Sequence, residues 1–163
     1  MVSATIRKAK KCDITELSRL YSLSYRFANV GQDWTPKTAK RLLLYLFGQN
    51  KKVCLVATDK GKLIGAFFAA CKPACHGHII SDGELFVHPS CQKKGIGSRL
   101  VFEVFKKCRK SFRTNTASFS TFKKGHPLSW YKSIGFQNDT ELLLIEGNIA
   151  NIIKNLEKRM ESG

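Results

Sequence analysis

Residues 84–100 read ELFVHPSCQKKGIGSRL, the pattern of a strand, a glycine-containing turn and the first turn of a helix. Gly95 and Gly97 let the backbone take positive φ and approach a ligand closely, so the N–H groups from Lys93 to Ser98 can converge on one anion. The helix that follows adds the positive end of its dipole. The stretch therefore predicts a phosphate-binding turn, with an ordinary helix start as the alternative.

The glycine spacing separates this turn from two nucleotide-binding motifs. A dinucleotide fingerprint needs a third glycine where Leu100 stands, and its turn follows the strand at once, whereas seven residues separate Val87 from Gly95 here. A P-loop needs Gly-Lys-Ser/Thr, which this stretch lacks. The phosphate ligand should therefore be of another kind.

Two blocks of the sequence resemble one enzyme family. The segment Gln92-Lys93-Lys94-Gly95-Ile96-Gly97 is similar to the Gln/Arg-x-x-Gly-x-Gly/Ala coenzyme A loop of the GNAT superfamily of N-acetyltransferases. Residues 85–89 resemble that family's fourth strand, and residues 129–136 resemble its second recurrent block. The resemblance implies a mixed α/β (α+β) acyl-CoA N-acyltransferase fold. Its mainly antiparallel central sheet would be flanked by helices on both faces and opened between the fourth and fifth strands.

The resemblance also implies a reaction, the direct transfer of an acetyl group from acetyl-CoA to a primary amine, and a binding site for the coenzyme. Main-chain groups of one strand would pair with the pantetheine arm, and the glycine turn would hold the pyrophosphate. The implied coenzyme-binding residues are Leu85, Phe86, Val87, Gln92, Lys93, Lys94, Gly95, Ile96, Gly97, Ser98, Arg99 and Lys124. Family members often carry a coenzyme-contacting asparagine where residues 123–127 read Lys-Lys-Gly-His-Pro here.

Three residues are candidates for catalysis. Tyr131 stands where many family members carry a tyrosine close to the coenzyme sulfur, which implies a general acid. Asp82 and Glu84 lie on the same side of a regular strand, and either could take the proton of the acceptor ammonium directly or through water. A surface ion pair is the alternative for each carboxylate. His88 and His126 are weaker candidates for the base.

The connection between the first two predicted helices covers the acceptor site in the family that the chain resembles. The candidate substrate residues are Phe27, Gln32, Asp33 and Trp34, and the alternative is a loop anchored by one buried tryptophan. The positive field favours a peptide or protein amine, a small amine bearing an anionic group, or an aminoacylated RNA over a polycation.

Charge is the second strong feature of the chain. It carries 28 basic and 12 acidic residues, for a net charge of +16. Such a field attracts anions, and part of it would serve the phosphates of coenzyme A. A nucleic-acid-associated protein is therefore an alternative function, as is a catalytically inactive acyl-CoA sensor. A soluble, highly charged surface is the simplest explanation.

The six cysteines are expected to be reduced thiols rather than a disulfide framework. Cys71, Cys75, His76 and His78 could bind zinc, but the cysteine spacing is wider than usual, so we expect no metal cofactor. The chain has no run of 18 apolar residues and no apolar signal core at residues 1–8. We therefore expect a cytoplasmic protein without a membrane span.

Residues 1–147 are predicted to form one acetyltransferase domain. An amphipathic helix at 148–163 follows, packed on that domain or at a homodimer contact. The hydrophobic periodicity predicts strands over 5–8, 53–57, 63–70, 79–87, 117–122 and 141–145, and helices from Asp13, over 36–47, from Gly97, over 127–134 and over 148–160.

Overall fold

The computed structural model describes residues 4–75, 77–123 and 126–161. The chain divides into two compact units, Met1–Thr121 and Phe122–Gly163. The first unit contains β1 (Thr5–Lys8), α1 (Ile14–Ala28), α2 (Pro36–Gln49), β2 (Cys54–Asp59), β3 (Lys62–Ala74), β4 (Gly77–Val87), α3 (Ile96–Phe112) and β5 (Thr116–Ala117). Three short 3-10 helices join them: η1 (Lys11–Asp13), η2 (Lys51–Val53) and η3 (Pro89–Cys91).

The sheet of the first unit has the order β1-β2-β3-β4-β5. All neighbours are antiparallel except β4 and β5, which are parallel. The tight β2–β3 turn contains Lys60 and Gly61, both with positive φ (47° and 80°), as a two-residue hairpin requires. The predicted mixed α/β class with a mainly antiparallel sheet is confirmed.

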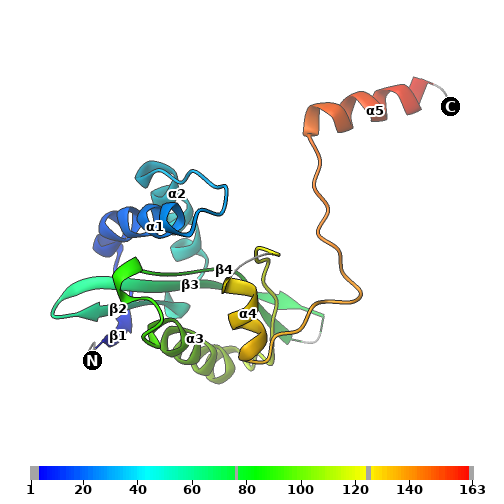
Figure 1. Cartoon of the computed structure of the whole chain (residues 1–163). Helices are drawn as coiled ribbons and strands as arrows, with labels where there is room; N and C mark the ends of the chain where they lie inside the picture. Colours follow the sequence, from blue (N-terminus) through cyan, green and yellow to red (C-terminus); the bar gives the residue numbers. More distant parts are fainter. Residues whose placement is uncertain (1–3, 76, 124–125, 162–163) are drawn as a thin grey trace. The chain divides into compact units, whose positions relative to one another are not determined.

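Helices cover both faces of this sheet: α1 and α2 lie on one face and α3 on the other (Figure 1). Tyr21 of α1 and Leu43 of α2 are fully buried on the first side with Phe68 of β3. Each large side chain buried in this way contributes about 1.5–3 kcal/mol to folding. The apolar stripes of α1 and α2 are therefore the packing faces of these helices.

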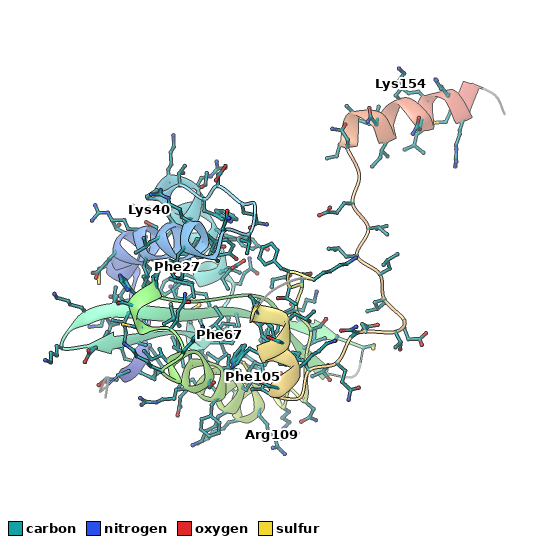
Figure 2. The ribbon with its side chains drawn as sticks, in the orientation of Figure 1. Phe27, Lys40, Phe67, Phe105, Arg109 and Lys154 are labelled. Atoms are coloured by element: carbon teal, nitrogen blue, oxygen red, sulfur yellow. The ribbon has the colours of Figure 1, made fainter. Side chains whose placement is uncertain are left out.

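The other face of the sheet packs against α3. Leu100, Val104 and Cys108 of this helix are fully buried. Phe105 of α3 and Phe67 of β3 have ring centroids 6.4 Å apart, whereas Arg109 lies on the outer side of the helix (Figure 2). The helix predicted from Gly97 is confirmed, and it is apolar on its inner side and basic on its outer side.

A β-bulge interrupts β4 at Asp82 and Gly83. Phe68 pairs with Glu84 and Ala70 with Ser81, so two residues of β4 lie opposite one residue of β3. Asp82 has a φ of 48°, and such a bulge bends the strand and redirects its side chains. Position 83 must be glycine, because a Cβ there would lie 2.7 Å from Phe67 Cε2 and 3.0 Å from Phe119 Cε1.

The sheet opens at this bulge. β5 pairs with β4 only at Thr116 with Ile79 and Ala117 with Ile80, and the Ser118 N–H adds one bond of 2.9 Å to the Ile80 carbonyl. Among the described residues, the part of β4 after the bulge pairs with β3 alone. The predicted opening between the fourth and fifth strands is present, although β5 is shorter than the predicted strand 117–122.

The second unit contains α4 (His126–Ser133) and α5 (Ile149–Glu161). The strand predicted at Glu141–Ile145 is wrong, since residues 142–148 adopt no helix or strand and Leu142–Ile145 are 72–84% exposed. A strand propensity is realised only when a partner strand completes the ladder, and no described strand pairs with this segment. The aliphatic run is therefore extended chain without a sheet.

The apolar side of α5 consists of Ile149, Ile152, Ile153, Leu156 and Met160, which are 46–74% exposed. This is the stripe that the sequence predicts. Its packing on the domain or at a homodimer contact stays a prediction.

None of the six cysteines is disulfide-bonded. Cys54 and Cys108 are buried, and this burial raises the pKa of each thiol to about 12. The described residues contain no cluster of three metal-ligating side chains, and His76 lies outside them. No helix in the described part of the chain is long and apolar enough to cross a membrane.

Candidate active site

A hollow of about 450 Å³ lies in the first unit, where β4 bulges away from β5. It is lined by Leu42, Tyr45 and Leu46 of α2, by Asp82, Gly83 and Glu84 of β4, and by Phe119 and Ser120 after β5. Ligand sites for small molecules have volumes of about 300–1,000 Å³. The hollow is therefore large enough for a small amine.

Glu84 is the most constrained polar group of this hollow. Its Oε2 accepts hydrogen bonds from the hydroxyls of Tyr21 at 3.0 Å and Tyr25 at 2.9 Å, whereas its Oε1 accepts none from the described residues. Burial raises the pKa of Glu84 above the ordinary value of 4.5, and the two tyrosine hydrogen bonds offset part of that increase. A carboxylate with a raised pKa and one free oxygen is suited to accept a proton.

Aromatic packing holds the two tyrosines in place. Tyr21 and Tyr25 are one turn apart on α1, and their rings stack with centroids 4.5 Å apart. Trp34 and Phe86 meet the Tyr21 ring edge-on at 5.3 and 5.1 Å. Burial and the nearby Glu84 raise the pKa of Tyr21, so its hydroxyl stays protonated and remains a donor.

Tyr21 lies on the buried face of α1, but the sequence does not predict that either tyrosine belongs to the site. The available signal is chemical: a buried tyrosine hydroxyl requires a hydrogen-bond partner, and few acceptors are available in a core. Tyr21 therefore points to a polar group on the facing strand.

Asp82, the second candidate base, is exposed and lines the same hollow as Glu84. The predicted clustering of the two carboxylates is therefore present, although a bulge rather than a regular strand produces it. Ser81 Oγ lies 3.4 Å from Asp82 Oδ2, a long hydrogen bond. Asp82 is thus freer to move than Glu84.

The candidate acceptor loop supports the tyrosines rather than the hollow itself. Trp34 is partly buried against the core, its Nε1 donates to Gln32 Oε1 at 2.9 Å, and its carbonyl accepts from Ser22 Oγ. Phe27 is 64% exposed at the end of α1, and Asp33 is also exposed. None of the four predicted substrate residues lines the hollow.

The glycine turn begins α3. Lys93 and Gly95 have positive φ angles of 57° and 78°. The Arg99 N–H donates to the Gly95 carbonyl at 3.0 Å, which closes the first turn of the helix. The N–H groups of Ile96, Gly97 and Ser98 therefore have no partner within the helix and are available to an anion.

Two side chains of the turn are tied to the scaffold. Gln92 Nε2 donates to the Val87 carbonyl at 3.1 Å, and Lys94 Nζ donates to the Ser90 carbonyl at 2.7 Å. A Cβ on Gly97 would make an ordinary contact of 3.8 Å with Leu85 Cδ2, so the start of α3 lies beside β4. The turn is therefore held next to the open side of the sheet.

The hydrogen-bond alternation of β4 decides which main-chain groups face that opening. The His88 N–H donates to the Ile64 carbonyl at 2.8 Å. In an antiparallel ladder every second residue then bonds to β3, so the main-chain groups of Glu84 and Phe86 face β3 and those of Leu85 and Val87 face away. The Val87 carbonyl accordingly accepts from Gln92 and from Ser24 Oγ at 3.1 Å.

A family model fits the region that carries these features. The model described as "Acetyltransferase (GNAT) domain" matches residues 50–138, which is more than half of the chain. The chain belongs to the GNAT acetyltransferase family. This GNAT domain thus includes β4, the glycine turn and both candidate carboxylates. None of the curated proteins matches it significantly.

Solved structures share the fold of this GNAT protein. A possible acetyltransferase from Clostridium difficile 630 has a TM-score of 0.70 and 16% identity, over 89% of this chain and 98% of that one. A predicted acetyltransferase from Clostridium acetobutylicum, solved with acetyl-CoA, has a TM-score of 0.67 and 18% identity, over 88% of this chain and 96% of that one. A ribosomal-protein-alanine N-acetyltransferase from Brucella melitensis biovar Abortus 2308 has a TM-score of 0.68 and 19% identity, over 90% of this chain and 100% of that one.

Two predicted site residues of the GNAT protein lie beyond the first unit. Tyr131 lies on α4, where its ring contacts those of Trp130 and Phe136 at centroid distances of 4.9 and 5.3 Å. Lys124 lies outside the described residues. The roles of both residues stay predictions.

Proposed function

We propose that this acetyltransferase uses acetyl-CoA to acetylate a primary amine, with Glu84 as the general base. The observation that carries the proposal is the largely buried Glu84 carboxyl group at a hollow beside the open edge of β4. Two tyrosine hydroxyls hold one of its oxygens, and the other accepts no hydrogen bond from the described residues. A carboxylate in this setting can bind an ammonium ion and remove its proton.

The open edge of β4 and the glycine turn would bind the coenzyme. The main-chain groups of Leu85 and the N–H of Val87 face away from β3 and suit the amides of a pantetheine arm, which would add to the sheet as an extra strand does. The N–H groups at the start of α3 suit the pyrophosphate. Lys93 and Arg99 add positive charge at the same turn.

The proposed chemistry needs one base, one oxyanion donor and one acid. Glu84 takes a proton from the acceptor ammonium, directly or through water, and the freed amine attacks the thioester carbonyl carbon. A free N–H on the open side of β4 stabilises the tetrahedral oxyanion. The C–N bond forms first and gives the tetrahedral oxyanion. When the oxyanion collapses, the C=O bond re-forms, the C–S bond breaks and the departing sulfur takes a proton from the Tyr131 hydroxyl. The surplus proton on the attacking nitrogen is lost to solvent, from which the tyrosinate regains one.

A thiol-release assay with acetyl-CoA and pooled primary amines tests the proposal, with mass spectrometry of the products. We expect one equivalent of thiol for each acetylated amine, and thermal stabilisation of the protein by acetyl-CoA. Stabilisation without turnover on any amine would favour the inactive sensor. Neither stabilisation nor turnover would refute acetyl-CoA as the co-substrate.

The proposed acid predicts a modest, pH-dependent effect for Tyr131→Phe. A free thiol has a pKa of about 8.5, so the thiolate leaves readily and kcat should fall only about tenfold at neutral pH. The loss should shrink above the thiol pKa, where the leaving group no longer needs a proton. Steady-state kinetics between pH 6 and pH 9.5 measure this effect.

Trp130→Phe on the same helix is the matched control, because it alters the same aromatic cluster without removing the hydroxyl of Tyr131. The proposed acid predicts normal kcat for this variant. A uniform loss in both variants at every pH would assign Tyr131 to packing instead.

A further inference from the structure

The lining of the hollow has a charge opposite to that of the whole protein. The chain carries a net charge of +16, yet the ionisable carboxyl groups that line the hollow are Asp82 and Glu84, and none of the described lysines and arginines lines it. Because Glu84 Oε1 accepts no hydrogen bond from the described part of the chain, the acidic side of the hollow has an acceptor available to an ammonium group.

The opposite side of the hollow is apolar. Leu42 and Leu46 of α2 contribute aliphatic surface, and Tyr45 and Phe119 contribute aromatic rings. Tyr45 is 60% exposed, so a ligand can cover surface that is now in contact with solvent. The Phe119 ring lies so close to Gly83 that position 83 accepts no side chain, which keeps the wall next to the carboxylates.

We infer that the acceptor is an ammonium group with an apolar or aromatic neighbour and without a negative charge close to the nitrogen. This inference rests on the proposed function and names its substrate class. A carboxylate on the carbon next to the amine would face Asp82 and Glu84 and be repelled. A second ammonium group would meet the leucine and phenylalanine wall, where it would lose water without gaining a partner.

Of the acceptors that the positive field of the chain favours, the local lining therefore disfavours a small amine bearing an anionic group and remains compatible with a peptide amine. Two sources present the inferred chemistry: a small arylalkyl amine, and the amino terminus of a peptide whose first residue is apolar. In the peptide the neighbouring carboxyl group is an amide, so its negative charge is absent.

Acceptors that share one phenyl skeleton test the inference. The panel contains 2-phenylethylamine, phenylalaninamide, phenylalanine, a phenylalanyl-alanine amide, and spermidine as the polycation. We expect kcat/KM for phenylalaninamide to exceed that for phenylalanine by about tenfold or more, as one repelled charge near two carboxylates would produce. The kcat/KM for spermidine should be as low as that for phenylalanine. The ratio of kcat/KM for the peptide to kcat/KM for 2-phenylethylamine distinguishes the two sources: a high ratio favours a peptide amino terminus, and a low ratio favours a small arylalkyl amine.

Asp82→Asn provides the matched variant. Asparagine tolerates positive φ well, so the backbone of the bulge is retained while one charge is removed. The preference for phenylalaninamide over phenylalanine should narrow about threefold or more in this variant. Asp59→Asn in the β2–β3 hairpin changes the net charge equally and should leave the preference unaltered.

Calorimetric binding of the same amines, in the presence of coenzyme A, gives a readout that does not require turnover. If phenylalanine binds as tightly as phenylalaninamide, or more tightly, the inferred substrate class is wrong even if acetyl transfer occurs. Preferential binding of phenylalaninamide without any thiol release would instead sink the proposed reaction and leave the assigned ligand class standing.

Discussion

Replacing Glu84 with Gln should lower kcat by roughly 100- to 1,000-fold while leaving the affinity for acetyl-CoA unchanged, as expected when a general base is removed. The amide is nearly the size of the carboxyl group and can still accept hydrogen bonds from Tyr21 and Tyr25, so the fold should persist. Thiol release at saturating amine gives kcat, and calorimetry gives the dissociation constant of acetyl-CoA.

The raised pKa of Glu84 predicts the direction in which the pH profile of the enzyme should differ from that of an exposed glutamate. Burial raises its pKa above 4.5, so the acid limb of kcat/KM should lie above the range of an exposed glutamate, and Glu84→Gln should lack that limb. The stability contribution of the protonated group is complete below the unfolded pKa and is lost as pH rises through the folded pKa. The stability difference between wild type and Glu84→Gln should change in that same window.

Two further variants separate the base from its surroundings. Tyr25→Phe removes a hydrogen bond that lowers the pKa of Glu84, so the acid limb should move to higher pH without loss of the base. Asp82→Asn should keep most of kcat on an uncharged amine. If Asp82→Asn loses the rate and Glu84→Gln retains it, the base is Asp82.

Substituting Gly95 with Val should weaken acetyl-CoA binding by about 100-fold or more, because a β-branched residue strongly disfavours positive φ. Gly95 has a φ of 78°, and no atom lies within 4 Å of the position where its Cβ would stand. The penalty is therefore conformational rather than steric. To relieve it, the turn must rotate the N–H groups of Ile96 and Gly97 away from their common direction.

Gly61→Val is the matched control for this variant. Gly61 has a φ of 80° and equally open surroundings, but it lies in the β2–β3 hairpin turn. Both variants should lose similar amounts of thermal stability, whereas only Gly95→Val should lose coenzyme affinity. Equal loss of affinity in both would reveal a global effect, and normal affinity in both would exclude the turn as the pyrophosphate site.

Local patterns in the sequence were sufficient to predict most of the first unit. The short apolar runs of β2 and β3, the apolar stripe of α3 and the glycine turn at its start all depend on neighbours within a few residues. Such features are encoded where they occur. The carboxylates at 82 and 84 were also identified as a pair from their spacing, although a bulge rather than a regular strand brings them to the same hollow.

Features that depend on distant contacts were not predicted. The hydrogen bonds from Tyr21 and Tyr25 to Glu84 join residues 63 and 59 positions apart, and no local pattern reports such a pairing. The β4 bulge likewise depends on how β3 pairs, and Gly83 alone did not reveal it. At Leu142–Ile145 the pattern was misleading, because four consecutive aliphatic residues have the propensity of a strand but no described partner.

If acetyl-CoA binds as proposed, the half-paired state of β4 makes the stability of the protein depend on the concentration of acyl-CoA. Leu85 and Val87 present an incomplete ladder at the open side of the sheet, and a ligand that completes it binds the folded chain alone. Such a ligand stabilises the protein by about 2.7 kcal/mol at one hundred times its dissociation constant. The fraction of molecules that unfold and reach proteases would then fall as acyl-CoA accumulates, so the lifetime of the protein would follow the supply of its own co-substrate.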